Sequence, residues 1–314
     1  MRIFDGFDGV EQIKNAVLTI GTFDGVHIGH QRIIEQLNVE AKKNGGESVL
    51  FTFFPHPKMV LFPDSHQLKL LQTQDEKLEK LAQFGLQNTL VFPFTKEFSR
   101  MTATEFVRDF LVNKLNVKKL IIGYDHQFGK NREGNIEFLK EVAPIYGFEL
   151  IEIPAQEIDE VNVSSTKVRR ALMEGDVETA ASYLGSAYQL NGIVVKGKQL
   201  GRTIGFPTAN IDLQSDLKLV PAKGVYAVQV KLEDGMIYHG MMNIGERPTV
   251  DNSHKVSIEV HVFDFKADIY KQTISVQLLR RIRDEQKFDS IELLTKQLQE
   301  DEITVRGIVD TKLV

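Results

Sequence analysis

Two histidines near the start of the chain are spaced for chemistry on a phosphate group. The segment Gly21–His30 has the sequence GTFDGVHIGH, which places His27 and His30 three residues apart with Gly29 between them. If a helix begins here, both imidazoles lie on one side of its first turn. The unpaired N–H groups and the positive end of the helix dipole favour an anion at the same place. Two imidazoles there could stabilise a phosphate that gains charge in a transition state.

The same histidines could instead form a surface pair without a role, or part of a metal site. A chain of this composition contains roughly 0.015 His-x-Gly-His matches by chance, so coincidence explains the motif poorly. No third ligand of the kind that zinc usually takes follows nearby, and the chain has no cysteine. Phosphate chemistry is therefore the favoured interpretation.

A second candidate phosphate-binding segment, Val163–Leu172, has the sequence VSSTKVRRAL. Ser164 and Thr166 are good helix N-cap residues, and Lys167 and Arg169 then fall in or near the first turn. Bases at this end of a helix are unfavourable for its dipole, a cost that a bound anion would offset. A solvated basic helix start explains the same residues, so both interpretations remain open here.

A third segment, Gly197–Asn210, is rich in glycine and has the sequence GKQLGRTIGFPTAN. The glycines that recur at every fourth position are Gly197, Gly201 and Gly205. The spacing is neither that of a Walker loop nor that of a dinucleotide-binding motif, but such a loop can turn N–H groups toward phosphates. Thr208 and Asn210 alternate from the start of a strand, so both oxygens can face one Mg²⁺ ion. The alternative is a glycine-rich turn with buried Thr and Asn.

The first two segments lie in a half of the chain where strands and helices alternate. The expected strands are Ala16–Gly21, Ser48–Phe54, Thr89–Phe92, Lys119–Ile122 and Phe148–Ile153. The expected helices are His30–Lys43, Asp75–Phe84, Glu105–Lys114 and Asn135–Tyr146. This alternation predicts a parallel sheet covered on both faces, in which ligands bind beyond the carboxyl ends of the strands.

Beyond about Leu184 the pattern changes to strands with few helices between them. The expected strands are Tyr188–Val195, Val225–Leu232, Met236–Asn243, Val256–Phe263 and Thr273–Arg281. They predict an antiparallel sheet or small barrel, followed by a helix over Ser290–Asp301 with Asp289 as its cap and Glu292 three residues later. The change of pattern places a domain boundary between residues 184 and 185.

Composition limits the class of protein. The 314 residues are 42% hydrophobic and 26% charged, as in globular chains of about two domains. The net charge of −5 argues against a nucleic-acid partner. No apolar stretch is long enough to cross a membrane, and the N-terminus has no signal-peptide pattern. Together with the absence of cysteine, these features predict a cytoplasmic protein without nucleic-acid or membrane partners.

The motifs together resemble a known family. GTFDGVHIGH followed by SSTKVR is similar to the nucleotidyltransferase superfamily, and FFPHP at Phe53–Pro57 and GYDHQFG at Gly123–Gly129 resemble the bacterial flavin adenylyltransferases. With the second half, the chain resembles the bifunctional riboflavin kinase/FAD synthetase family from about Phe4 to Asp301. The resemblance implies a Rossmann-like nucleotidyltransferase domain with a parallel sheet at 1–184. A small antiparallel β-barrel riboflavin kinase domain with a C-terminal helix would follow at 185–314.

For the first domain, the resemblance implies transfer of AMP from ATP to FMN, with release of pyrophosphate and no covalent enzyme intermediate. His27 and His30 would bind phosphate and stabilise the transition state. The other residues implied to contact ATP are Gly21, Phe23, Gly29, Ser164, Thr166, Lys167 and Arg169. Those implied to shape the flavin and nucleotide pockets are Phe54, His56, Asp125 and Phe128. Ordinary loop packing would explain Phe54 and His56 as well. His126 and Gln127 depart from the aromatic and basic residues common in the family.

For the second domain, the resemblance implies phosphorylation of riboflavin by ATP. Thr208 and Asn210 of PTAN would bind Mg²⁺, and Glu259 in the strand SIEVHVFDF would be the general base. The residues implied to contact ATP are Gly197, Gly201, Arg202, Gly205 and Pro207. A solvent-facing strand glutamate is the alternative for Glu259. Lys271 and the pair Ser186-Ala187 depart from the family pattern without touching these ligands.

Two other functions compete with this hypothesis. A nucleotidyltransferase for another acceptor, such as pantetheine phosphate or nicotinate mononucleotide, leaves PTAN and Glu259 unexplained. A nonenzymatic flavin-binding regulatory protein would have lost site residues, yet the motifs are complete. The expected small-molecule partners are therefore riboflavin, FMN, FAD and ATP, while the oligomeric state stays open.

Overall fold

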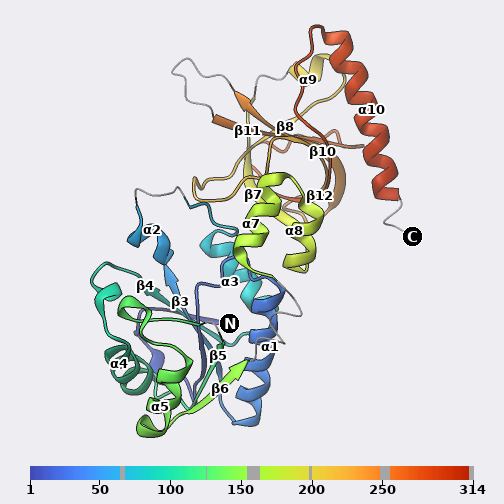
Figure 1. The fold of residues 1–314 in the computed structure, drawn as a ribbon. Helices are drawn as coiled ribbons and strands as arrows, with labels where there is room; N and C mark the ends of the chain where they lie inside the picture. Colours follow the sequence, from blue (N-terminus) through green and yellow to red (C-terminus); the bar gives the residue numbers. More distant parts are fainter. Residues whose placement is uncertain (64–67, 125, 154–162, 198–199, 248–254, 311–314) are drawn as a thin grey trace. The chain divides into compact units, whose positions relative to one another are not determined.

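The computed structural model describes residues 1–63, 68–124, 126–153, 163–197, 200–247 and 255–310. The chain forms two compact units, Met1–Ser165 and Thr166–Val314 (Figure 1). Asp125, which the sequence assigned to a pocket, lies outside the described residues. The expected domain boundary between residues 184 and 185 stays a prediction.

The first unit is built on a six-stranded sheet in the order β1-β4-β3-β2-β5-β6. All neighbouring strands in it are parallel. Its strands are β1 (Arg2–Asp5), β2 (Val17–Ile20), β3 (Ser48–Phe54), β4 (Asn88–Pro93), β5 (Lys119–Gly123) and β6 (Glu149–Ile153). The five strands expected from the sequence are confirmed. The edge strand β1 was not expected, because a segment of four residues, two of them charged, is too short to show a strand pattern.

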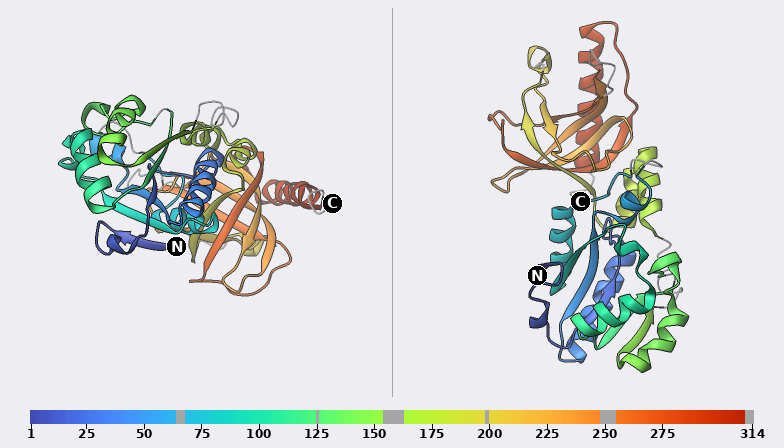
Figure 2. Two further views of the ribbon diagram at one scale, coloured as in Figure 1. Left: turned by 90° about the horizontal axis from the view of Figure 1, so that it is seen from below. Right: turned by 90° about the vertical axis from the view of Figure 1, so that its left-hand side faces the viewer.

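Helices cover both faces of this sheet (Figure 2). Successive strand residues point to opposite faces, so Val17 packs in the same cluster as Leu37 of α1 and Leu81 of α3. Leu18 packs in the other cluster, with residues of η3 and α5 such as Leu111. The helices of the unit are η1 (Val10–Gln12), α1 (Ile28–Lys43), α2 (Pro57–Leu61), α3 (Gln74–Gln83), η2 (Phe98–Arg100), α4 (Ala103–Glu105), η3 (Phe106–Lys114), η4 (Lys130–Arg132) and α5 (Ile136–Tyr146). The predicted parallel sheet with two covered faces is confirmed.

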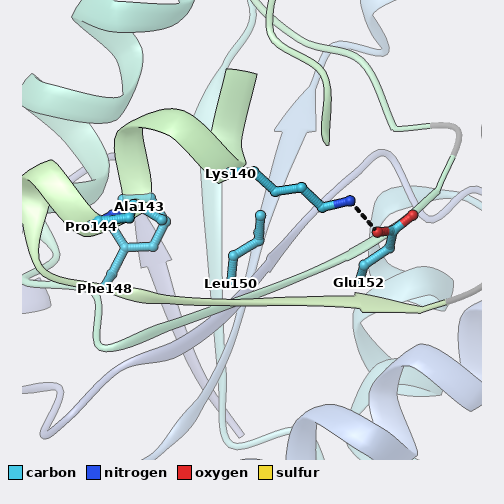
Figure 3. A pocket seen from close by; sticks show the side chains of 6 residues that line it. All are labelled: Lys140, Ala143, Pro144, Phe148, Leu150 and Glu152. Carbon is cyan, nitrogen blue, oxygen red and sulfur yellow. Dashed lines mark ion pairs between the residues drawn. The ribbon is translucent and has the colours of Figure 1, made fainter. Parts of the chain in front are cut away.

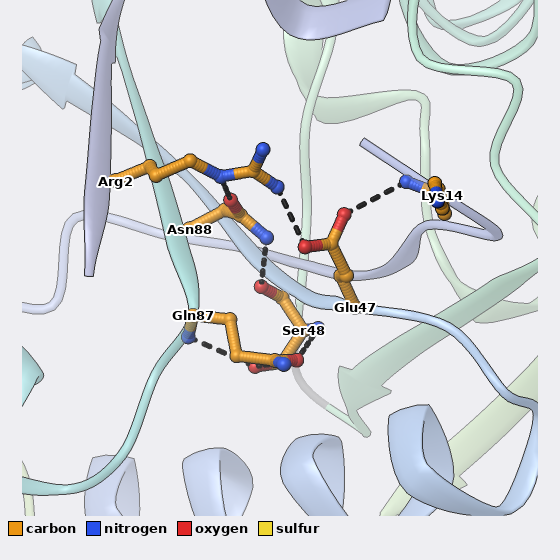
Figure 4. Close-up of polar contacts among 6 residues, drawn as sticks. All are labelled: Arg2, Lys14, Glu47, Ser48, Gln87 and Asn88. Carbon is orange, nitrogen blue, oxygen red and sulfur yellow. Dashed lines mark hydrogen bonds and ion pairs between the residues drawn. The ribbon is translucent and has the colours of Figure 1, made fainter. Parts of the chain in front are cut away.

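A polar network closes the amino ends of three strands (Figure 4). The buried Asn88 side chain accepts a hydrogen bond from Arg2 Nε at 2.9 Å and donates one to the Ser48 carbonyl at 3.1 Å. Arg2 also pairs with Glu47 at 2.6 Å. Because the strands are parallel, these contacts fix the end of the sheet at which the strands begin. The loops that follow β2 and β3 leave the sheet at the opposite end, where the strands finish.

The second unit is a closed antiparallel barrel in the order β10-β11-β8-β7-β12-β9. Its strands are β7 (Tyr188–Val195), β8 (Ala209–Asp212), β9 (Gly224–Lys231), β10 (Ile237–Arg247), β11 (Lys255–Val262) and β12 (Thr273–Arg283). Its helices are α7 (Ser165–Glu174, which begins on the last residue of the first unit), α8 (Val177–Leu184), α9 (Leu200–Thr203) and α10 (Ile291–Asp310). Val305 and Val309 of α10 pack with Met241 and Phe263 in one hydrophobic cluster. The predicted small barrel with a C-terminal helix is confirmed.

The cap of the last helix differs from the expectation. The sequence favoured Asp289, but the helix begins at Ile291, and the Ser290 hydroxyl oxygen accepts a hydrogen bond from Leu293 N at 3.2 Å. Ser290 therefore occupies the capping position, since both residue types are good caps and only the first helical turn decides between them. No helix in the described part of the chain is long and apolar enough to cross a bilayer.

Candidate functional site

The loop between β2 and α1 carries the histidine pair of the first unit. Phe23, Gly25 and Val26 have φ angles of 49°, 90° and 38°, so the chain makes a tight left-handed turn before the helix. A side chain at Gly21 would bring its Cβ within 2.8 Å of the Phe23 ring. Glycine at this position thus lets the Phe23 ring fold back against the loop, a role that the sequence did not show.

Three rings stack at the start of α1. The Phe23 and His30 ring centroids lie 4.4 Å apart at 21°, and those of His30 and His27 lie 3.6 Å apart at 16°. His27 is also the N-cap of the helix, because its Nδ1 accepts a hydrogen bond from His30 N at 3.3 Å. An Nδ1 that accepts leaves the proton of the neutral ring on Nε2. The geometry therefore makes Nε2 the donor atom of the neutral His27 ring.

The electrostatics of the pair favour a neutral His30. Burial lowers the pKa of His30 well below its usual value, and the nearby charges of His27 and Lys77 lower that pKa further. The buried His30 Nδ1 also has no hydrogen-bond partner among the described residues. A buried polar atom left unpaired costs about 1–3 kcal/mol. Such a cost is expected where a ligand completes the site.

Asp24 connects this loop to the second predicted phosphate segment. Its buried carboxylate accepts hydrogen bonds from Leu71 N at 3.0 Å and Gln72 N at 3.3 Å. Its backbone carbonyl accepts one from the Ser165 hydroxyl at 2.8 Å. The structure thus joins the segment around Ser164 to the histidine loop. Sequence reasoning missed Asp24, although it is the only charged residue of GTFDGVHIGH.

The basic residues of the second segment lie at the start of α7. The helix begins at Ser165, so Lys167 is in its first turn and Arg169 follows in the second. Thr166 and Lys167 are exposed, while Ser164 and Arg169 are half-buried. The local placement agrees with the expectation that bases stand at a helix N-terminus.

The residues expected to contact flavin have different surroundings. Phe54 ends β3 with 40% of its surface exposed, and His56 caps α2 by accepting from Lys58 N at 3.2 Å. Phe128 belongs to a large aromatic cluster, with its ring centroid 5.4 Å from that of Phe106. Phe54 is therefore partly exposed at the end of β3, and its role in binding flavin stays a prediction.

A shallow pocket of about 240 Å³ lies between α5 and β6 (Figure 3). It is lined by Lys140, Ala143, Pro144, Phe148, Leu150 and Glu152, and Lys140 pairs with Glu152 at 2.9 Å. It contains none of the residues singled out from the sequence. We therefore assign it no part in the chemistry.

In the second unit, strand pairing brings together residues far apart in the chain. Asn210 of β8 stands opposite Glu259 of β11, and the Thr208 hydroxyl donates to Glu259 Oε2 at 3.4 Å, across 51 positions of sequence. Ile258 and Val260 are buried on the other face of the strand. Glu259 thus lies opposite Asn210 and in contact with Thr208, while the binding of one ion by Thr208 and Asn210 stays a prediction.

Glycines surround these residues closely. A Cβ at Gly197 would lie 2.2 Å from Asn210 Nδ2, and one at Gly201 would lie 2.1 Å from the Phe206 carbonyl oxygen. Gly205 has a φ of 85°. The glycine spacing therefore allows the backbone to pass close to Asn210 and to turn before Phe206, whatever else these N–H groups bind.

Two further contacts hold the segment around Pro207. His261 Nδ1 lies 2.7 Å from the Pro207 carbonyl oxygen, and the Arg202 guanidinium donates to the Tyr270 hydroxyl at 3.3 Å. Sequence reasoning missed His261. Its position two residues after Glu259, on the same face of the strand, was the available signal.

The donors of the second site fit a magnesium ion. A hydroxyl, an amide and a carboxylate are hard oxygen groups, and Mg²⁺ is usually bound by few protein oxygens together with water and substrate phosphates. In the described part of the chain, no group of three His, Cys, Asp or Glu side chains could hold a metal. A metal at Thr208 and Asn210 would therefore depend on the nucleotide for further ligands.

Comparison with known proteins agrees with this division of the chain. The FAD synthetase family model matches residues 10–167, and the riboflavin kinase family model matches residues 184–309. A bifunctional riboflavin kinase/FMN adenylyltransferase of Escherichia coli K12 is 38% identical over 98% of this chain and 97% of its own length. The chain belongs to the bifunctional riboflavin kinase/FMN adenylyltransferase family.

A further relative and a solved structure are similar to nearly the whole chain. The relative from Haemophilus influenzae is 35% identical over 99% of this chain and the whole of its own length. A crystal structure of a Streptococcus pneumoniae protein, named a macrolide-efflux protein, has a TM-score of 0.88 and 34% identity over 98% of this chain and 99% of that one. That name differs from those of the curated relatives, whereas the fold is the same.

Proposed function

We propose that each unit of this flavin-biosynthesis enzyme carries out one of two consecutive reactions. The second unit converts riboflavin and ATP to FMN and ADP. The first unit converts FMN and ATP to FAD and pyrophosphate. The observation that carries the assignment is that each unit has its own polar site within the residues matched by one family model. Mg²⁺ is proposed for the kinase reaction, with ATP as co-substrate of both.

Adenylyl transfer to FMN depends mainly on position and charge. An oxygen of the FMN phosphate attacks the α-phosphorus of ATP in line, and the bond from that phosphorus to the pyrophosphate oxygen breaks. His27 and His30 donate hydrogen bonds to the phosphate oxygens as their charge grows. The residues proposed to hold the β- and γ-phosphates of ATP, which leave as pyrophosphate, are those at or just before the start of α7: Ser164, Thr166, Lys167 and Arg169.

The second unit needs a base. Glu259 removes the proton of the terminal ribityl hydroxyl as the γ-phosphoryl group arrives, and ADP leaves. The Thr208 hydroxyl, which contacts the same carboxylate, holds it in place. Thr208 and Asn210 would hold Mg²⁺, which neutralises phosphate charge when bound. Gly197, Gly201, Arg202, Gly205 and Pro207 are proposed to surround the nucleotide phosphates.

The flavin contacts of the first unit are a further part of the proposal. The exposed ring of Phe54 offers an apolar surface to an isoalloxazine. His56 and Phe128 are proposed to complete the pocket on either side. Both reactions consume ATP, which supports the predicted cytoplasmic location.

The test is incubation of the full chain with riboflavin, ATP and MgCl₂, followed by chromatography of the products. We expect FMN first and FAD later, with pyrophosphate released in step with FAD. FMN without FAD would remove the proposal for the first unit. Neither product would remove both, and a parallel assay with pantetheine phosphate or nicotinate mononucleotide would then identify another acceptor.

A further inference from the structure

A lysine is buried beside the loop that carries the histidine pair. Lys77 lies on α3 and is only 6% exposed. Its ammonium donates hydrogen bonds to the Thr22 carbonyl at 3.3 Å and to the Thr52 hydroxyl at 3.2 Å. Both acceptors are uncharged. Lysine is rarely buried without an acidic hydrogen-bond partner, because removing its charge from water costs several kcal/mol.

The contacts of Lys77 lead directly to the ring stack. Thr22 precedes Phe23, whose ring stacks on His30. The Thr22 carbonyl also accepts a hydrogen bond from the Thr52 hydroxyl at 3.2 Å. The tight turn at Phe23 is therefore anchored, on its N-terminal side, to a charged group from another element.

The other side of the turn is anchored by the segment just before α3. Asp24 follows Phe23, and its carboxylate is held by Leu71 N and Gln72 N. The start of α3 is fixed in turn by a capping box between Thr73 and Glu76. One helix and its leading segment thus hold the loop before and after Phe23.

Charge connects the same groups. Burial lowers the pKa of Lys77 to about 8, and the charge of Asp24 opposes this shift. Lys77 in turn lowers the pKa of His30, after burial and His27. The titratable groups that interact with the ammonium are therefore Asp24 from the loop and His30 from α1, with His27 beside it. Below about pH 8 the ammonium of Lys77 keeps its positive charge beside His30, whose lowered pKa favours the neutral ring.

We propose that Lys77 is a positioning residue for nucleotidyl transfer in the first unit. Its ammonium fixes the Thr22 carbonyl and, through it, the Phe23–His30 stack, and it adds a positive potential for the anionic phosphates of ATP. The inference rests on the proposed assignment of FMN adenylylation to this unit. A purely structural role would be met better by an apolar side chain of the same length, such as methionine.

The test compares three variants of the full chain. Lys77→Met removes both charge and hydrogen bonds, and Lys77→Gln keeps an N–H donor without the charge. Lys80→Met is the matched control, because Lys80 lies on the same helix and is half-buried against Phe84. We expect kcat/KM for FAD formation from FMN and ATP to fall about 10- to 100-fold in Lys77→Met. The fall should be smaller in Lys77→Gln and less than about twofold in Lys80→Met. FMN formation in the same samples should be unchanged.

The pH profile separates positioning by charge from a structural role. For the parent chain, kcat/KM for FAD formation should decline above about pH 8, where Lys77 loses its proton. This limb should be absent in Lys77→Met. In Asp24→Asn it should move to lower pH, because the charge of Asp24 raises the pKa of Lys77.

Three results would overturn the inference while leaving the function intact. The first is a Lys77→Met protein that forms FAD at the parent rate, and the second is one that keeps the alkaline limb. If Lys77→Met fails to fold and also loses FMN formation, the pH profile of Asp24→Asn is the deciding measurement. The third result is an Asp24→Asn protein in which the alkaline decline of FAD formation stays at the same pH as in the parent chain. A parent chain that forms no FAD at all would instead remove the assignment of the reaction.

Discussion

The candidate sites of the two units are assembled in different ways. In the first unit, His27 and His30 are neighbours on one helical turn, and their rings stack with Phe23 of the same loop. In the second, Glu259 meets Thr208 and Asn210 only because β11 pairs with β8. The first site is local in sequence, whereas the second depends on the register of the barrel.

The two sites also differ in their polar support. Asp24 and Lys77, which hold the first site, are buried charged side chains. At the second site, the Thr208 hydroxyl contacts Glu259, and His261 contacts the Pro207 carbonyl. Burying a charged side chain lowers the stability of the folded protein unless its interactions compensate for it. The buried charges beside the first site therefore indicate that function has been favoured over stability there.

The largest effect should come from the local site. His30→Ala removes the middle ring of the stack and one hydrogen-bond donor to the transition state. We expect FAD formation to fall by about 10³-fold, measured as the steady-state rate from supplied FMN and ATP. FMN formation from riboflavin is the internal control and should change less than about twofold. An equal loss of both activities in a folded protein would contradict the division into two sites.

Glu259→Gln tests the site of the second unit, and the expected loss of activity is the reverse of that in His30→Ala: FMN formation falls and FAD formation is retained. The amide keeps the shape of the side chain but cannot accept the proton of the ribityl hydroxyl, so FMN formation should fall about 10²- to 10⁴-fold. Product chromatography from riboflavin and ATP measures this fall. FAD formation from supplied FMN should be unaffected, and a comparable loss there would show that Glu259 is not confined to the kinase reaction.

Thr208→Val sharpens the comparison by addressing the metal. The change keeps the size and β-branching of the side chain but removes the hydroxyl that contacts Glu259. We expect the Mg²⁺ concentration for half-maximal FMN formation to rise about 10-fold. Thr273→Val, at the exposed start of β12, is the control. An unchanged Mg²⁺ dependence in Thr208→Val would exclude this hydroxyl as a ligand.

Gly21→Ala tests whether the ring stack must be intact. The added Cβ would lie 2.8 Å from the Phe23 ring, which must then move away from its present position beside His30. Small displacements in a site of this kind reduce rates about 10- to 100-fold, so FAD formation should fall by that order. Gly307→Ala, where a Cβ meets no atom within 4 Å, is the control. FAD formation at the parent rate would mean that the stack tolerates displacement.

The smallest expected effect is on the stability of Lys77→Met, which should rise although its rate of FAD formation falls. Lowering the pKa of Lys77 from 10.5 to about 8 corresponds to a cost of about 3 kcal/mol at neutral pH. Two hydrogen bonds, worth about 1 kcal/mol each, partly offset it. Lys77→Met should therefore raise the unfolding free energy of the first unit by about 1 kcal/mol at pH 7, as measured by denaturant titration.

The pH dependence of that gain follows from the protonation of the two states. Below pH 8 the folded and unfolded chains both hold the proton, so the cost is complete. Between about pH 8 and 10.5 the folded chain releases the proton while the unfolded chain keeps it, and stability rises with pH. The advantage of Lys77→Met should thus shrink across this range. A variant that is less stable than the parent at pH 7 would show that the ammonium stabilises the fold.

Most elements could be predicted because their patterns are local. Ser48–Phe54 is bounded by Pro55, and both ends of β3 agree with the expectation. Tyr188–Val195 alternates buried and half-buried residues, and β7 has the expected bounds. The four-residue strand β1 and the cap of α10 were missed because their patterns are too short or fit two neighbouring residues equally well.

The sequence by itself determined the two classes of chemistry. The spacing of His27 and His30, and the order of residues in PTAN, depend only on neighbours along the chain. The spacing of residues along the chain is the same in the unfolded and the folded protein, so these motifs can be recognised without the structure. The alternation of strands and helices likewise follows from local periodicity.

The tertiary structure alone decided how these groups are held. Nothing near Lys77 or Asp24 in the sequence indicates that the first would be buried against Thr22 and Thr52, or the second against Leu71 and Gln72. Burial and the register of β11 with β8 arise from packing between elements distant in the chain. The pKa values of His30 and Lys77 follow from that packing, because desolvation exists only once the surrounding elements exclude water.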